Sequence, residues 1–80
     1  MTADQVRAAH RAQPFQPFEI NLADGRSFRV THPEAMLQTP GGRTICVAVG
    51  DEVVEWIDLL LVTSLTKGNG HTRPRTKRKR

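Results

Sequence analysis

The chain has few of the residues that staple small secreted domains or bind metal ions. Cys46 is its only cysteine among 80 residues, so an internal disulfide and a zinc site built on paired cysteines are both excluded. This usage fits a reducing cytoplasm. The three histidines, His10, His32 and His71, have no second ligand at a helical or hairpin spacing. We therefore expect no metal and no other cofactor.

Long apolar runs are also lacking. The longest, residues 59–62, is far shorter than the roughly eighteen residues that cross a bilayer. The N-terminal residues lack the charged region and apolar stretch of a secretion signal. A basic tail can adhere to anionic lipid, but stable anchoring needs a second signal, and the sequence shows none clearly. We expect a cytoplasmic protein without membrane attachment.

No motif for catalysis is evident. His32 and Glu34 flank a proline, where a surface or turn residue is expected rather than an acid–base pair. Cys46 lies among apolar residues with no adjacent base, which predicts a buried packing residue rather than a reactive thiol. Gly41 and Gly42 indicate a turn rather than a phosphate cradle, because no helix opens after them. We expect a chain that is not an enzyme and has no small-molecule substrate.

Acidic residues are absent from the last fourteen positions, which hold seven of the twelve basic residues. Residues 1–66 contain five arginines and eight acidic residues, a formal charge of −3, whereas residues 67–80 carry +7. A run of like charges with no apolar residue cannot offset the entropy cost of ordering. The sequence therefore predicts one small domain, residues 1–66, followed by a flexible, disordered basic tail, residues 67–80.

The tail predicts contact with nucleic acid. Lysine and arginine fit phosphates through charge and hydrogen-bond geometry, and phosphate neutralisation releases counterions, so this binding is salt-sensitive and indifferent to sequence. The alternative is that the tail only keeps the chain soluble. We expect RNA or DNA to contact Lys67, Arg73, Arg75, Lys77, Arg78, Lys79 and Arg80. The acidic body is a poorer site for a polyanion, with Arg26, Arg29 and Arg43 as helpers.

The N-terminal residues predict a short helix. Thr2 and Gln5 have the spacing of a capping box, which favours a helix over residues 3–12. Its apolar positions Val6 and Ala9 form only a narrow stripe, so we expect a lid or an appendage rather than part of the core. Two prolines then end the helix.

Apolar residues at every second position predict a hairpin over residues 18–31. A two-residue loop would send its apolar sets to opposite faces. A three-residue loop, residues 23–25, instead places Ile20 opposite Phe28 on one apolar face, with Gly25 in the left-handed conformation. Pro33 then interrupts the second strand, because proline cannot donate to a ladder.

A second hairpin is predicted farther along the chain. Residues 44–49 are apolar on both faces, which favours a central strand. A two-residue loop at Gly50 and Asp51 would pair Ile45 with Trp56 and place the only tryptophan on the buried face. Base stacking and interface anchoring are the alternatives for this side chain, but we expect burial because the chain has only four aromatic residues.

Residues 57–65 are compatible with two structures. Asp58 is placed to cap a short helix, whereas Val62 and Thr63 favour a buried strand after a brief turn, which we expect. The predicted fold is mainly β: a small, strongly bent antiparallel sheet or SH3/Sm-like barrel of about five strands, with a short N-terminal helix and a basic C-terminal tail.

Three segments carry a family resemblance. Residues 14–26, 32–34 and 57–65 resemble an uncharacterised family of small bacterial proteins, and the likeness covers about residues 5–66 and brings no known activity. More distantly, the N-terminal helix, the first strand ending in Asp24-Gly25-Arg26 and the late apolar strand are similar to the Sm-like fold, which includes a bacterial RNA chaperone. That resemblance implies a bent five-stranded barrel that assembles into rings through edge strands.

The chain departs from the Sm-like pattern at two places. The chaperone's RNA-binding Tyr-Lys-His segment falls opposite residues 58–60, which are Asp-Leu-Leu, and its Asn-rich segment is absent between His32 and Arg43. Uridine recognition is therefore not implied. We predict a non-enzymatic binding module that contacts RNA or DNA through its tail. The alternative is a protein-interaction or self-assembly module, a homo-oligomer or a partner-bound domain, that uses exposed sheet edges.

Overall fold

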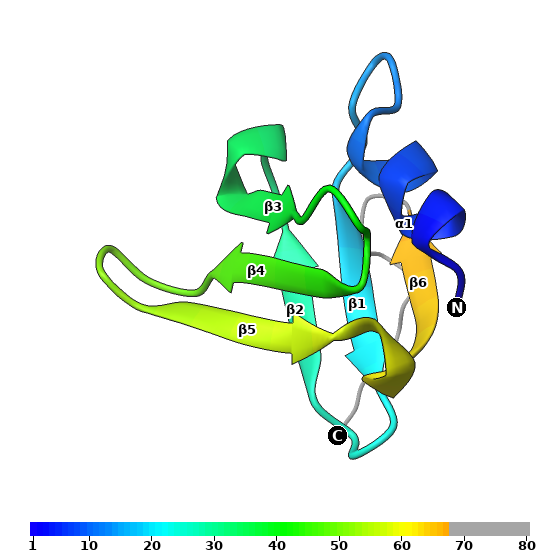
Figure 1. Ribbon diagram of the computed structural model, residues 1–80. Coiled ribbons are helices and arrows are strands. Elements are labelled where there is room, and N and C mark those ends of the chain that lie inside the picture. Colours follow the sequence, from blue (N-terminus) through cyan, green and yellow to red (C-terminus); the bar gives the residue numbers. More distant parts are fainter. Residues whose placement is uncertain (68–80) are drawn as a thin grey trace, which may run out of the picture.

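The computed structural model of the chain describes residues 1–67, which form a mainly β domain with one helix (Figure 1). Within this range lie the helix α1 (Ala3–His10) and the strands β1 (Phe18–Leu22), β2 (Ser27–Val30), β3 (Met36–Gln38), β4 (Thr44–Ala48), β5 (Val54–Asp58) and β6 (Val62–Lys67). The mainly β class and the N-terminal helix are confirmed. Six strands are described where about five were predicted, because β3 is too short to show a period of two.

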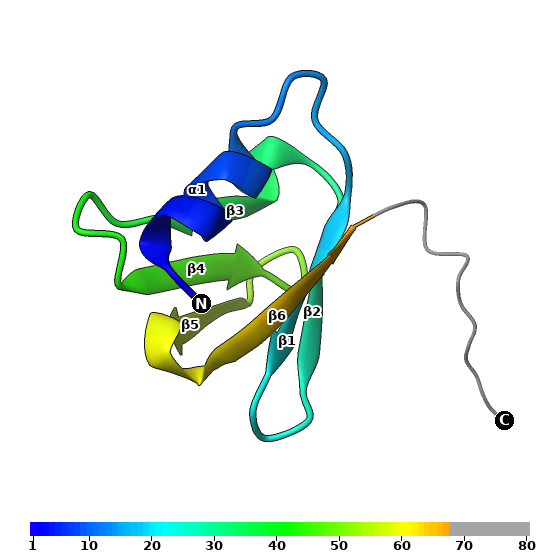
Figure 2. The ribbon, with the colours of Figure 1, turned by 90° about the vertical axis from the view of Figure 1, so that its right-hand side faces the viewer.

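The strands form two antiparallel sheets of three. The first has the order β2-β1-β6 and the second the order β3-β4-β5. Figure 2 shows the two sheets facing each other, with α1 beside the second. Within residues 1–67, no helix is long and apolar enough to cross a membrane.

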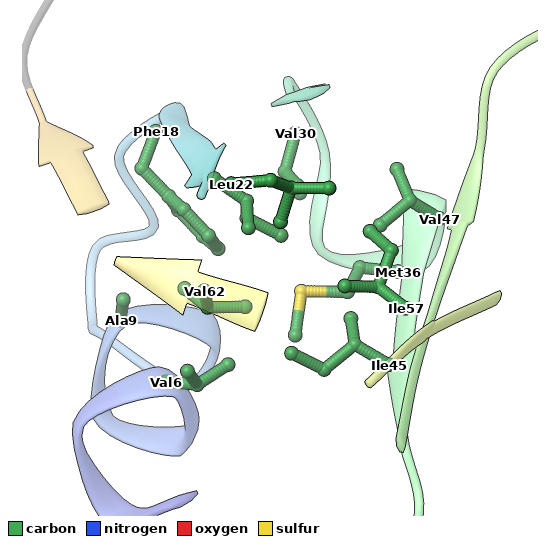
Figure 3. Close-up of a cluster of buried hydrophobic side chains, with 11 residues drawn as sticks. Val6, Ala9, Phe18, Leu22, Val30, Met36, Ile45, Val47, Ile57 and Val62 are labelled. Carbon is green, nitrogen blue, oxygen red and sulfur yellow. The ribbon is translucent and has the colours of Figure 1, made fainter. Parts of the chain in front are cut away.

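The core lies between the sheets and the helix (Figure 3). Its members are aliphatic apart from one phenylalanine and one methionine, and all of them are nearly inaccessible to solvent. They are Val6, Ala9, Phe18, Ile20, Leu22, Val30, Met36, Ile45, Val47, Ile57 and Val62. Both sheets and the helix contribute to this one cluster, so they form a single packing unit.

The helix begins with the predicted capping box. The Gln5 backbone N–H donates to the Thr2 hydroxyl at 3.2 Å, and the Thr2 N–H donates to the Gln5 side-chain oxygen at 2.9 Å. The expectation of a lid or appendage is wrong, because Val6 and Ala9 are buried in the core. Two small sheets leave residues such as Val62 open on one side, and the narrow helical stripe closes that side (Figure 3).

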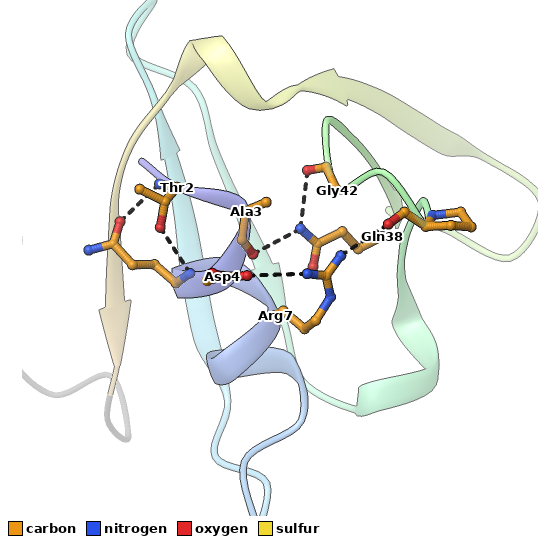
Figure 4. Close-up of polar contacts among 8 residues, drawn as sticks. Thr2, Ala3, Asp4, Arg7, Gln38 and Gly42 are labelled. Carbon is orange, nitrogen blue, oxygen red and sulfur yellow. Dashed lines mark hydrogen bonds and ion pairs between the residues drawn. The ribbon is translucent and has the colours of Figure 1, made fainter.

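The turn between β3 and β4 holds the helix in place (Figure 4). The Gln38 side-chain amide donates to the carbonyls of Ala3 and Gly42, each at 3.1 Å, and the Arg7 guanidinium donates to the Pro40 carbonyl at 3.4 Å. Gly42 has a φ of +82°, and a Cβ added there would lie 2.6 Å from the Ala3 Cβ. The predicted turn at Gly42 is confirmed, and the residue must be glycine for two independent reasons.

We expect Gly42→Ala to lower the free energy of unfolding by about 2–3 kcal/mol, because it adds a steric clash with the helix to the strain of a positive φ. Gly25→Ala is the matched control. Gly25 also has a positive φ of +94° but has no atom within 4 Å of the added Cβ, so about 1 kcal/mol is expected. Urea unfolding followed by far-UV circular dichroism measures both losses. Equal losses would contradict the close packing of α1 on this turn.

The first hairpin has the predicted register. Ile20 pairs with Phe28, and the Leu22 N–H donates to the Arg26 carbonyl at 2.8 Å around a three-residue loop. Gly25 adopts the expected left-handed conformation. The single apolar face of this hairpin, packed on the core, therefore fixed the pairing.

The second hairpin departs from the prediction by one residue. The Val49 N–H donates to the Val53 carbonyl, so the loop has three residues, and Ile45 pairs with Ile57 rather than with Trp56. A slip of one residue turns every side chain of a strand to the other face. Trp56 therefore pairs with Cys46 on the outer side and is 66% exposed, whereas Ile57 is buried at 2%. The central position of β4 is confirmed.

The segment that follows β5 combines a short turn with a strand. Asp58 accepts a hydrogen bond from the Leu60 N–H at 2.9 Å and caps a 3₁₀ turn, Leu59–Leu61. The predicted strand is confirmed as β6, which pairs with β1. It ends at Lys67, the first residue of the predicted basic tail.

Candidate functional site

The two sheets have outer faces of opposite chemistry. On the first sheet, Asn21 is the centre of a polar cluster: its amide donates to the hydroxyls of Ser64 at 3.1 Å and Thr66 at 2.9 Å, and its carbonyl oxygen accepts from Ser27 at 2.9 Å. These side chains come from all three strands of the sheet. A face of this kind is suited to water.

The outer face of the second sheet is mostly apolar. A cross-strand row of Leu37, Cys46 and Trp56 runs over β3, β4 and β5. Rows on either side pair Ala48 with Val54 and Thr44 with Asp58. We call these seven residues the Trp56 face.

The large side chains of the Trp56 face are exposed to solvent. Leu37 is 60% exposed, Val54 48% and Trp56 66%. Cys46 beside them is partly exposed, so its predicted burial is wrong. Single exposed apolar residues are common on protein surfaces, but a contiguous group that includes a tryptophan typically marks an interaction site.

The local sequence explains why this face forms. In β4, Ile45 and Val47 point into the core, which turns the intervening Cys46 and Ala48 outward. Both sets are apolar, yet a domain of this size has one core and can bury only one of them. Sequence reasoning missed Leu37 and, through the two-residue loop, assigned both Val54 and Trp56 to the buried face. The signal that could have found them is apolar residues at both odd and even positions of two neighbouring strands.

The surroundings of the Trp56 face are acidic. Residues 44–66 contain four acidic residues and no basic one. Asp51 and Glu52 are exposed in the loop before β5, and Asp58 is exposed at the end of that strand. The apolar stretch of β5 is therefore bounded by negative charge at both ends, which favours a cationic partner.

Arg26, which was predicted to assist nucleic-acid binding, is paired with acidic residues of the domain. Its Nε lies 2.9 Å from the Asp24 carboxylate and its Nη1 lies 3.6 Å from Glu55, and its guanidinium lies 5.6 Å from the centre of the Phe28 ring. The pKa of Asp24 is lowered from its ordinary value, mainly because its carboxylate accepts the Arg26 backbone N–H and also because the guanidinium lies beside it. The charge of Arg26 is thus largely matched locally.

The structure places the other predicted basic residues on separate elements. Arg29 is exposed on β2 opposite Glu19, and Arg43 is exposed in the turn before β4. Lys67 is exposed at the end of β6, where its backbone pairs with Phe18. The remaining predicted contacts, which all lie outside the described residues, are Arg73, Arg75, Lys77, Arg78, Lys79 and Arg80.

Of the two histidines within residues 1–67, one connects two elements of the fold and the other lies on the surface. His10 Nε2 lies 2.7 Å from the Pro33 carbonyl and donates to it in the tautomer that carries the proton there, which links α1 to the turn before β3. His32 is exposed. Among residues 1–67, no three metal-ligating side chains come together.

Comparison of the chain with models of known protein families, with curated proteins and with solved structures finds no match. The resemblances to the small bacterial family and to the Sm-like fold therefore stay predictions.

Proposed function

We propose that the chain is a non-enzymatic binding module that binds protein through the Trp56 face. The observation that carries this proposal is the exposure of Trp56 beside Leu37 on an apolar sheet face. Tryptophan is among the residues that most often dominate binding energy at interfaces, because it offers a large, rigid area with little entropy to lose. The outer face of the first sheet, centred on Asn21, differs from the Trp56 face because its polar side chains hydrogen-bond to one another.

The proposal includes the edge of the second sheet. Among residues 1–67, β5 pairs only with β4, so one side of β5 is an edge. Trp56 lies on this edge strand. A partner bound to the Trp56 face thus also lies close to the unpaired backbone groups at the edge of β5. The same partner is then placed to add a strand to this edge.

The test is site-specific photo-crosslinking in the cells that make the protein. We expect a photoreactive aromatic residue at position 56, which keeps a large ring in place of the indole, to give one discrete protein adduct, because that side chain lies in the interface. The same residue at position 21 is the matched control on the polar face and should give no such adduct. A second photoreactive position, Val54, should give the same adduct and lose it when Trp56→Ala is added. Adducts from position 21 and not from position 56 would refute the proposal.

A second candidate function is contact with RNA or DNA through the basic tail. The observation that favours it is the segregation of charge, with seven basic residues and no acidic one in residues 67–80. Such a segment binds polyanions through counterion release without a folded site. The first function uses the folded domain and the second uses the tail.

We also propose that the domain belongs to the small, strongly bent β-barrels of the SH3-like or Sm-like class. The support is the packing of two three-stranded antiparallel sheets around one core, with a short helix at one side. Assembly through sheet edges, as such barrels often show, is compatible with the exposed position of β5.

A further inference from the structure

We propose that the Trp56 face binds the basic C-terminal segment, residues 73–80, of a second copy of this chain. The inference rests on the proposed function and names its partner. Three properties support it: the charges on the two surfaces, the spacing of residues along β5, and the place where the described chain ends.

The charges of the two parts are complementary. Three exposed acidic residues, Asp51, Glu52 and Asp58, flank the apolar stretch of β5, whereas residues 68–80 have six basic residues and no acidic one. The apolar middle of the face also suits this partner. Arginine stacks its planar guanidinium on aromatic rings, tryptophan above all, and buries its aliphatic stem along apolar surface.

The spacing of the two segments also matches. Along β5 the outward residues Val54, Trp56 and Asp58 stand at every second position, preceded by the exposed Glu52. In the tail, every second position from Arg73 to Lys79 is basic, and the last four residues, 77–80, are all basic. Extended chains repeat about every 6.6 Å per two residues. An extended tail beside β5 thus sets one basic residue over Trp56 and the next over Asp58, two positions farther along the strand.

The place where the described chain ends favours a second copy over contact within one chain. Lys67 pairs with Phe18 in the first sheet, and Figure 2 shows β6 ending on the side away from β4 and β5. The six residues from Lys67 to Arg73 reach at most about 22 Å. The described domain measures 38 × 29 × 28 Å. The tail of the same chain would have to pass around the domain, whereas a neighbour's tail needs no such path.

This contact joins two different surfaces, so it is heterologous. Each copy offers one face and one tail, and such contacts form rings when the rotation closes and open chains when it does not. Assembly should weaken as salt rises, because the attraction is between exposed charges. A nucleic acid that binds the tail should also dissociate the assembly.

Two full-length variants separate the two halves of the contact. The first, Trp56→Ala, keeps the tail and loses the centre of the face. The second, the tail-neutral variant, replaces the six basic residues after Lys67 by glutamine and keeps the face. We expect wild-type chains, freed of nucleic acid with nuclease, to form dimers or larger species at low salt. Each variant alone should stay monomeric by sedimentation velocity.

The decisive sample is the mixture of the two variants. The tail of the Trp56→Ala chain should bind the face of the tail-neutral chain and give a one-to-one heterodimer. Trp56 is the chain's only tryptophan, so in this mixture its fluorescence reports the face alone. A saturable change in emission is expected, weakened roughly tenfold or more when salt rises from low to physiological values.

Two controls check the chemistry. A tail with its four arginines changed to lysine keeps its charge and loses guanidinium stacking, so binding should weaken several-fold without disappearing. Asn21→Ala, on the polar face, should leave assembly unchanged. Leu37→Ser serves as a second face variant, because its side chain is 60% exposed and outside the core.

The possible outcomes separate this inference from the proposed function. Absence of a heterodimer, with both variants folded, overturns the inference. Another outcome is that the tail-neutral variant still assembles and that adding Trp56→Ala to it abolishes the assembly. The Trp56 face would then bind a second Trp56 face. The inference would fall, and the protein-binding proposal would stand. If neither variant affects assembly and position 56 gives no crosslinked adduct, both fall.

Discussion

Ile57→Ala is expected to lower the free energy of unfolding by about 3–4 kcal/mol, whereas Trp56→Ala, one residue away, changes it by less than about 1 kcal/mol. Ile57 is 2% exposed and pairs with Ile45 on the core side of the second sheet. Truncation there leaves a cavity among residues from both sheets. Trp56 faces solvent, so its removal takes away little buried area.

Urea unfolding followed by far-UV circular dichroism measures both changes. Ile57→Val removes one methylene-sized group from the same place and should cost about 0.5–1.5 kcal/mol, which checks that the loss scales with volume. The hairpin register predicted from the sequence, with Trp56 buried opposite Ile45, requires the reverse order. A larger loss for Trp56→Ala than for Ile57→Ala would contradict the face on which the proposed function depends.

Nucleic-acid binding through the tail should weaken several-hundredfold when the salt concentration is tripled. Seven positive charges that each neutralise a phosphate give a slope of log K against log salt of about −5 to −6, from roughly 0.7 to 0.9 per phosphate. The tail-neutral variant keeps only Lys67 of these charges and should lose nearly all affinity. RNA and DNA should both bind, since phosphates rather than bases are contacted.

Fluorescence anisotropy of labelled single-stranded RNA and duplex DNA provides the measurement. The matched control changes Arg26, Arg29 and Arg43 of the body to glutamine. These residues lie on different elements, and Arg26 is paired with Asp24 and Glu55, so the control should retain most of the affinity. A shallow slope, or a greater loss from the body arginines than from the tail, would contradict tail-led binding.

The first hairpin could be predicted from the sequence because only one arrangement of its residues buries a single apolar face. The alternation of residues 18–31 and the glycine at position 25 left one compatible loop length. The start of the helix at Thr2 could also be predicted from neighbouring residues, because a capping box needs only two residues three positions apart. Local rules were sufficient for both elements.

The second hairpin could not be predicted in the same way. In β4, Ile45 and Val47 alternate with Cys46 and Ala48, and in β5 Val54 and Trp56 alternate with Ile57. Both strands thus have apolar residues on both faces, so burial alone does not choose between two registers. The choice depends on how the second sheet packs against the first, because Val47 and Ile57 of the second sheet contribute to the shared core. The burial of Val6 was missed for a related reason, because only the assembled sheets show the gap that a narrow helical stripe fills.

The candidate site was missed as a consequence of that register. With Trp56 assigned to the buried face, the outer side of β5 has no candidate residue, and the tail stands out because its charge is visible in the sequence without a fold. The exposed row of Leu37, Cys46 and Trp56 depends on three strands and two pairings. It becomes apparent only once the order β3-β4-β5 is known.

The protein-binding proposal requires that the second sheet turns the only tryptophan outward on an apolar face. Acrylamide quenching of Trp56 fluorescence in the dilute tail-neutral chain measures this exposure. We expect long-wavelength emission and quenching nearly as efficient as that of the unfolded chain, in line with 66% exposure. Short-wavelength emission protected from acrylamide would mean that Trp56 is buried, and the Trp56 face would not exist as a binding surface.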